Sequence, residues 1–237
     1  MARISQLITT IKEASRQKGI HYVIKRGLYI WLYVIYYKIF CKGRSFSFRG
    51  KKYRYFYDII NNTWINERSV EVSIVMETVN RNLGKRILEI GNVLSNYYDL
   101  PHEVVDKYEK APNVINQDVV DFKSNEKYDL IISISTLEHV GWDEKPRDDE
   151  KIPKALETLR NLLKLDGTMI VTLPFGYNQA LNRHLNQGTI RFNEQYYLLR
   201  TGSNSWREAS WDEIKETIFG NPYSGANGLI IGIDHGW

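Results

Sequence analysis

The stretch KRILEIGN, residues 85–92, decides the fold, because it reads as a buried strand with an acidic residue near its end, followed by a glycine turn. Three further short strands are expected at 103–106, 114–116 and 128–135, and a polar or acidic residue stands at or beyond the end of each. Strands that are buried on both faces of a parallel sheet read as such continuous apolar runs. Ligands of these sheets bind outside the carboxyl ends of the strands, so the polar residues gather where a nucleotide-like ligand would lie.

Segments with helical spacing alternate with these strands, and 153–163 is the clearest of them. A fifth strand follows at 168–173, and the segments 196–200, 206–209 and 228–233 suit closing antiparallel strands. Alternation of this kind predicts an α/β fold. We expect a doubly wound, Rossmann-like, seven-stranded sheet with an antiparallel C-terminal hairpin.

Charge divides the chain into a basic N-terminal arm and an acidic body. Residues 1–54 hold 13 Lys and Arg and one acidic residue, a net charge of +12, whereas residues 55–237 hold 19 Lys and Arg and 27 Asp and Glu, a net charge of −8. We therefore expect a basic, aromatic, helical arm at 1–45 and a catalytic-sized domain at 46–237.

The arm contains the most apolar window of the chain, at 27–40, with Lys and Arg on both sides. Its uncharged run, 27–37, is shorter than the roughly 20 residues that cross a bilayer. Tyr and Trp favour the membrane interface, so one hypothesis is a helix that lies on an anionic membrane surface. The alternative is a helix that packs on the body or on a second subunit. Nucleic-acid binding is disfavoured, because the basic arm has no recognisable nucleic-acid-binding motif.

Cysteine and histidine usage gives no sign of disulfides or structural zinc. Cys41 is the single cysteine and can form no intrachain disulfide, and no Cys/His group has zinc spacing. The acidic run 148–150 is better explained as a solvated helix start than as a metal site, because acidic side chains are favoured at helix N-termini. An intracellular protein without a metal is the expectation.

Five motifs in order make the chain resemble the class I S-adenosylmethionine-dependent methyltransferases, over roughly residues 84–175. They are ILEIG at 87–91, Asp106 after the second strand, Asp118-Val119, YDLIIS at 128–133 with TLEHV at 136–140, and LKLDGT at 163–168. The resemblance implies S-adenosylmethionine as the cofactor, with Asp106 on the ribose hydroxyls and Asp118-Val119 at the adenine. The cofactor contacts that it implies are Glu89, Gly91, Asn92, Asp106, Lys107, Asp118, Val119 and Ser135.

One departure from the family pattern falls in the glycine loop. The family usually has Gly-x-Gly, whereas this chain has Gly91-Asn92-Val93. Val93 adds a branched Cβ where a second glycine lets the backbone approach the cofactor. Asn92 could offset this, because asparagine tolerates left-handed backbone angles and its amide can bond a ligand.

His139 is the candidate general base, since it follows the fourth strand and histidine titrates near neutrality. Helix capping or a backbone hydrogen bond would explain this residue nearly as well. The candidate acceptor contacts are Trp142, Asp143, Tyr177 and Arg183. Rim packing is the alternative for Trp142 and Tyr177, and a solvated surface role is the alternative for Arg183. Glu138 or Asp143 could also orient the histidine.

These patterns together predict transfer of a methyl group from S-adenosylmethionine to an oxygen of a small-molecule or carbohydrate (glycan) acceptor. The alternative is a catalytically inactive binding or scaffold module of the same fold at the membrane surface. The expected location is cytoplasmic, with peripheral contact at the inner membrane face through residues 1–45. A glycan acceptor is favoured by a thinner resemblance to methyltransferases encoded beside surface-glycan enzymes.

Overall fold

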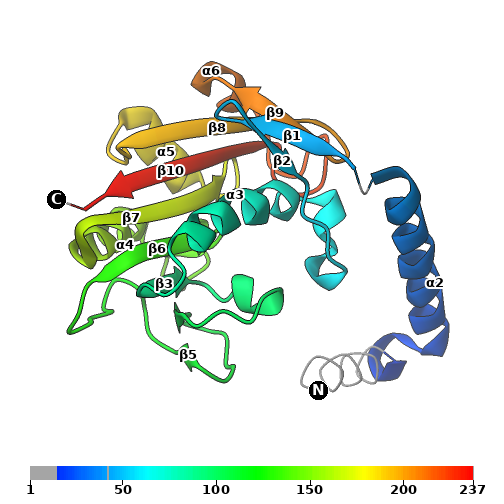
Figure 1. The fold of residues 1–237 in the computed structure, drawn as a ribbon, viewed down its shortest axis with the longest axis horizontal. Coiled ribbons are helices and arrows are strands. Elements are labelled where there is room, and N and C mark those ends of the chain that lie inside the picture. The colour runs from blue at the N-terminus through cyan, green and yellow to red at the C-terminus, as the bar shows by residue number, and fades with distance from the viewer. Residues whose placement is uncertain (1–14, 42, 237) are drawn as a thin grey trace. The chain divides into compact units, whose positions relative to one another are not determined.

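The computed structural model describes residues 15–41 and 43–236 (Figure 1). The chain divides into two compact units, Met1–Arg44 and Ser45–Trp237. Residues 1–14 and 42 of the predicted arm lie outside the described residues.

The first unit is helical where it is described. Helix α2 covers Ile20–Tyr36 and continues into a π-helical turn, η1, at Tyr37–Cys41. Gly19 precedes α2 with a φ of 82°, a conformation that few residues other than glycine adopt readily. Among the described residues, no helix has the length and apolar character needed to cross a membrane.

The second unit begins with an antiparallel hairpin and is built around a sheet of eight strands. The hairpin consists of β1 (Ser45–Phe48) and β2 (Lys51–Arg54). The order in the large sheet is β5-β4-β3-β6-β7-β10-β8-β9. Its strands are β3 (Ile87–Ile90), β4 (Glu103–Val105), β5 (Val114–Ile115), β6 (Tyr128–Ile134), β7 (Leu163–Pro174), β8 (Glu194–Gly202), β9 (Ser205–Ala209) and β10 (Gly228–His235).

The parallel half of the sheet confirms the predicted α/β, Rossmann-like fold. The strands β5, β4, β3, β6 and β7 are parallel to one another, while β10 is antiparallel to both β7 and β8. The predicted count of seven strands differs from the observed eight. Each of the eight segments that were expected to be strands does form one, and β10 inserts between β7 and β8, beside the β8–β9 hairpin.

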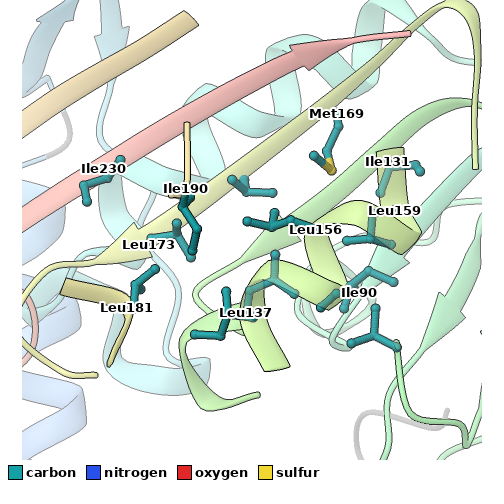
Figure 2. Packing of buried hydrophobic residues seen from close by; sticks show 14 of the residues in the cluster. Ile90, Ile131, Leu137, Leu156, Leu159, Met169, Leu173, Leu181, Ile190 and Ile230 are labelled. Atoms are coloured by element: carbon teal, nitrogen blue, oxygen red, sulfur yellow. The ribbon is translucent and has the colours of Figure 1, made fainter. Parts of the chain in front are cut away.

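Helices cover both faces of the sheet, as the doubly wound prediction requires. They are α3 (Arg68–Arg81), α4 (Lys151–Asn161), α5 (Gln179–Gln187) and the short α6 (Trp211–Ile214), with 3-10 turns η2 (Ile60–Ile65), η3 (Leu94–Asn96) and η4 (Leu137–His139). Leu156 and Leu159 of α4 pack with Ile90 and Ile131 (Figure 2). Alternate strand residues belong to a second core that contains the apolar side chains of α3.

Strand order also fixes where a ligand can bind. From β3 the chain moves outward through β4 to β5 and then returns to the other side of β3 as β6. The two halves therefore diverge between β3 and β6. In an open α/β sheet, the crevice at the carboxyl ends of the strands at such a point is the usual binding place.

A buried polar network ties α3 to the end of β6. The Glu71 carboxylate is fully buried and accepts hydrogen bonds from the hydroxyls of Ser135 and Thr172. The Arg68 guanidinium lies 2.9 Å from Glu71 and also donates to the carbonyl of Ile134. Arg68 thus supplies both the counter-charge of Glu71 and a direct bond to the strand end beside the crevice.

Replacing Arg68 with Met should destabilise the domain by about 3 kcal/mol at pH 8, because the buried Glu71 carboxylate loses its counter-charge. Urea unfolding followed by circular dichroism measures this change. The matched control is Arg81→Met on the same helix, where the side chain is 72% exposed and pairs with Glu77 at the surface, so that the loss should stay below about 0.5 kcal/mol. Equal losses in the two variants would contradict the proposed role of Arg68.

Candidate functional site

A cavity of about 710 Å³ lies at the carboxyl ends of β3 and β4 and beside the segment that follows β6. This is within the usual size range of cofactor and ligand sites. Eight of the residues predicted from the sequence line it: Gly91, Asn92, Asp106, Lys107, Asp118, Val119, His139 and Asp143. The topology therefore brings together side chains that are spread over 53 positions of sequence.

The glycine loop begins with a position that only glycine fits. Gly91 has a φ of 84°, and a Cβ at this residue would collide with the side chain of Thr136. Its N–H donates to the carbonyl of Val105 at 2.9 Å, so the turn is fastened to the neighbouring strand. Val93 has a φ of −92°, which is ordinary for a residue with a side chain, and it is buried in the cavity wall. The missing second glycine thus imposes no backbone strain.

Glu89 holds this loop in place from behind the cavity wall. Its buried carboxylate accepts hydrogen bonds from the backbone N–H groups of Val93 at 3.0 Å and Leu94 at 2.8 Å, and it meets the Nε2 of His102 at 2.7 Å. Burial alone lowers the pKa of His102, but the hydrogen bond and the charge of Glu89 outweigh it and raise that pKa. Glu89 does not line the cavity, so its observed role is to hold the glycine loop in position.

Asn92 presents an unused acceptor at the cavity. Its side-chain N–H donates to Glu109 at 2.7 Å, and its Oδ1 is buried with no hydrogen-bond partner among the described residues. A buried carbonyl oxygen without a partner is costly, because its interaction with water has been lost. A ligand donor at this point would satisfy it.

Asp106 directly follows β4, and its two carboxylate oxygens have different surroundings. Its Oδ1 accepts from the backbone N–H groups of Tyr108 at 2.8 Å and Glu109 at 2.7 Å. This cap shapes the loop that follows β4. It leaves Oδ2 as the oxygen for a bound hydroxyl group, since Asp106 lines the cavity.

Four charged side chains form an ion cluster at the same side of the cavity. Lys107 lies 2.8 Å from Asp118 and 2.9 Å from Glu144, and Lys151 lies 2.5 and 2.6 Å from the same two carboxylates. Burial works to raise the pKa of Asp118, but the hydrogen bonds from both lysines lower it overall. The cluster connects the ends of β4 and β5 to the segment after β6. Val119, next to Asp118, is buried and lines the cavity.

His139 is flanked by carboxyl groups on both ring nitrogens. Its Nδ1 lies 2.6 Å from Asp143, and its Nε2 lies 3.6 Å from Glu138. The Tyr177 hydroxyl donates to Asp143 at 2.9 Å, and its ring packs edge-on against the imidazole at 4.7 Å. Burial, followed by the hydrogen bond to Asp143, raises the pKa of Tyr177 to about 12, so the tyrosine stays a donor at neutral pH. These contacts hold the imidazole in one orientation at the cavity.

Glu138 differs sharply from Asp143 in its environment. Its carboxyl is 2% exposed, and its Oε2 has no hydrogen-bond partner among the described residues. Burial raises the pKa of Glu138 well above its usual range, so the neutral form is favoured. Asp143, whose side chain is 45% exposed, is the carboxyl group within hydrogen-bond distance of His139.

Five predicted contacts are not among the cavity-lining residues, namely Glu89 and Tyr177, which are described above, and Ser135, Trp142 and Arg183. Ser135 is buried and donates to Glu71 behind the end of β6. Trp142 stacks with Arg147, whose guanidinium carbon is 3.7 Å from the ring centroid. Arg183 on α5 pairs with Asp149 at 2.5 Å. Each side chain is thus engaged within the protein, and no cavity contact is observed for it.

Eleven of the lining residues were not among the predicted contacts, including Asn61, Thr136 and Glu144. Asn61 comes from η2 with a φ of 60°, and its side chain donates to the Tyr97 hydroxyl at 3.1 Å. Asn61 and Asn62 are adjacent asparagines that both adopt left-handed angles, so the pair was the available signal for a tight turn. Glu144 gave no such signal, because its place depends on the ion cluster.

Comparison with known proteins finds no matching family model and no matching curated protein. Among solved structures, the chain is similar to the N-methyltransferase NodS from Bradyrhizobium japonicum WM9, solved with S-adenosyl-L-homocysteine, at 12% identity and a TM-score of 0.45, covering 72% of this chain and 87% of that one. It is also similar to an S-adenosylmethionine-dependent methyltransferase from Clostridium acetobutylicum ATCC 824 (14% identity, TM-score 0.37, coverage 69% and 89%). A third is the sugar N-methyltransferase KedS8 from Streptoalloteichus sp ATCC 53650 (12% identity, TM-score 0.36, coverage 70% and 87%).

The His102–Glu89 pair should make stability depend on pH in a defined direction. Because the folded-state pKa of His102 is raised, its contribution is complete below the unfolded-state pKa of about 6.5 and is lost as the pH rises through the folded-state value. We expect the free-energy difference of unfolding between the wild type and His102→Gln to be larger at pH 5.5 than at pH 9. Urea unfolding at both pH values tests this. A free-energy difference that is larger at pH 9 than at pH 5.5 would contradict a raised pKa of His102 in the folded state.

Proposed function

We propose that this chain is a class I methyltransferase that transfers the methyl group of S-adenosylmethionine to an oxygen of a small-molecule or carbohydrate acceptor. The observation that carries the proposal is the cavity at the divergence of β3 and β6. It combines a glycine turn, the carboxylate of Asp106 and a carboxylate-supported histidine within one space.

The residues around the cavity suit the parts of this cofactor. Asp118 and Val119 would hold the adenine end, and the Asp106 carboxylate would accept from the ribose hydroxyls. The unused Oδ1 of Asn92 and the tight turn at Gly91 would serve the amino-acid end, where an ammonium group needs acceptors. When bound, the cofactor supplies an electrophilic methyl group on a sulfonium sulfur.

Within this proposal, His139 removes the acceptor's proton. Asp143 at Nδ1 fixes the ring tautomer, so that Nε2 is the nitrogen that accepts the proton. Asp143 also stabilises the imidazolium that forms, in the way that an acidic residue supports a catalytic histidine elsewhere. An acceptor ammonium would need the same proton removal, so sugar amines belong beside sugar alcohols in any acceptor screen.

Calorimetric titration of the purified full-length protein with S-adenosylmethionine and S-adenosylhomocysteine tests the cofactor site. We expect micromolar binding to the wild type, and a loss of about 10- to 100-fold in Asp106→Ala, which removes a hydrogen-bonded charge from the ribose position. Asp106→Asn removes the charge but keeps a side-chain oxygen that can accept the loop N–H bonds. It therefore distinguishes the effect of the lost charge from the effect of a lost loop cap. The control is Asp212→Ala, which removes an exposed carboxylate that pairs with Lys215 on α6.

Absence of binding to the folded wild type would remove the catalytic proposal and leave the scaffold alternative. Equal affinity in Asp106→Ala and the wild type would instead show that the cofactor lies elsewhere. The two outcomes separate a wrong function from a wrong placement of the ribose.

Transfer of labelled methyl groups to a panel of sugar alcohols and amines tests the base. His139→Asn should lower kcat about 10²- to 10⁴-fold while the Kd for S-adenosylmethionine stays within about twofold, because the residue acts in proton transfer and not in cofactor binding. In the wild type, kcat should fall toward acidic pH, because a base must be unprotonated to accept a proton, and this decrease should vanish in the variant. Unchanged kcat in His139→Asn would exclude the histidine as the base.

A further inference from the structure

Helix α2 carries an exposed apolar stripe that runs along its whole length. Five of its large apolar side chains recur at spacings of three and four, between 36% and 62% exposed: Ile20, Ile24, Leu28, Trp31 and Ile35. At about 100° per residue these positions fall within an arc of roughly 80°. A stripe of this kind on a helix normally faces something apolar, since large exposed apolar patches mark interaction sites.

Charge around the stripe identifies the kind of surface that it fits. Residues 14–57 contain 11 Lys and Arg and no acidic residue. Lys25 borders the stripe and is exposed, and the Lys18 ammonium lies 5.0 Å from the Tyr22 ring centroid. Long basic side chains of this type lay their apolar stems on a surface while the charged ends reach outward. The matching surface is therefore both apolar inside and negatively charged outside.

The exposed aromatic side chains of α2 also favour a membrane surface. Trp31 is 60% exposed and lies within the stripe, whereas Tyr29 and Tyr36, which are 53% and 49% exposed, fall about 80–100° beyond its edge on the side of Lys25. Tyrosine and tryptophan concentrate at the boundary between lipid headgroups and acyl chains, where one end of the ring is apolar and the other can bond water. An acidic bilayer surface provides all three features that α2 offers at once.

We propose that α2 lies in the plane of an anionic membrane, with the stripe inserted among the acyl chains and Lys25 at the phosphate level. Its 17 residues span about 26 Å, which is too short to cross the hydrocarbon core with flanking charges in place. A second copy of the helix is a poor occupant, because two strongly basic segments repel one another. Nucleic acid would use the cations but would leave the apolar stripe without a partner.

Flotation of the full-length protein with lipid vesicles tests this docking surface. We expect binding to vesicles of phosphatidylcholine containing about a third phosphatidylglycerol, and much weaker binding to phosphatidylcholine alone. The variant Ile24→Ser/Leu28→Ser/Ile35→Ser should bind the anionic vesicles about a hundredfold more weakly, because three inserted aliphatic side chains are lost. Lys18→Gln/Lys25→Gln should weaken binding at low salt more than at high salt.

A matched control replaces exposed aliphatic residues outside α2. Leu165 and Ile218 are 73% and 61% exposed, and Leu165→Ser/Ile218→Ser should float like the wild type. Circular dichroism confirms that each variant keeps its helix content. Three outcomes would overturn the proposal: no flotation of the wild type, equal flotation of the triple variant, or self-association that the triple variant abolishes in place of vesicle binding. This test is independent of cofactor binding, so it can fail while methyl transfer stands.

Discussion

The candidate site depends on one buried carboxylate. Glu89 lies next to the last residue of β3 and accepts from two successive backbone N–H groups of the following loop, and His102 contacts its other carboxylate oxygen. A buried carboxylate is tolerable only when donors surround it. The loop therefore cannot relax away from Glu89 without exposing an uncompensated charge, and this requirement fixes the positions of Gly91, Asn92 and Val93. The cavity wall is a consequence of satisfying that one group.

The need of carboxylates for nearby donors also explains how distant segments meet around the cavity. Asp106 shapes its own loop through two backbone N–H groups, and Asp118 and Glu144 are held by two shared lysines. Each carboxylate follows or faces a strand end, where the parallel sheet leaves backbone donors and open space. Because the two lysines pair with carboxylates from different segments, they hold these segments together at the adenine side of the proposed site.

Sequence alone predicted the parallel half of the fold because each buried strand leaves a continuous apolar run, and it predicted the lining residues that come directly after those strands. It did not predict Asn61 or Glu144, because their places come from a turn over the cavity and from an ion cluster between distant segments. Glu89 and Ser135 show a second limit. Both stand at strand ends, yet their side chains turn to buried partners, and nothing in a strand pattern states which polar residue faces a ligand and which faces the core. The order of the C-terminal strands was not predicted for a related reason, since three successive apolar segments do not reveal that the last inserts between earlier strands.

The two carboxyl groups beside His139 show how environment divides roles between chemically similar side chains. Glu138 is sealed from water and its raised pKa favours the neutral acid, whereas Asp143 is half exposed and shares its Oδ2 between the imidazole and the Tyr177 hydroxyl. Pairs of acids whose surroundings separate their pKa values are how a protein obtains a charged and a neutral group side by side. Within the proposed mechanism, the exposed acid lies on Nδ1, where its hydrogen bond orients the ring and leaves Nε2 as the proton acceptor. A neutral Glu138 at 3.6 Å from Nε2 does not act as a competing counter-ion.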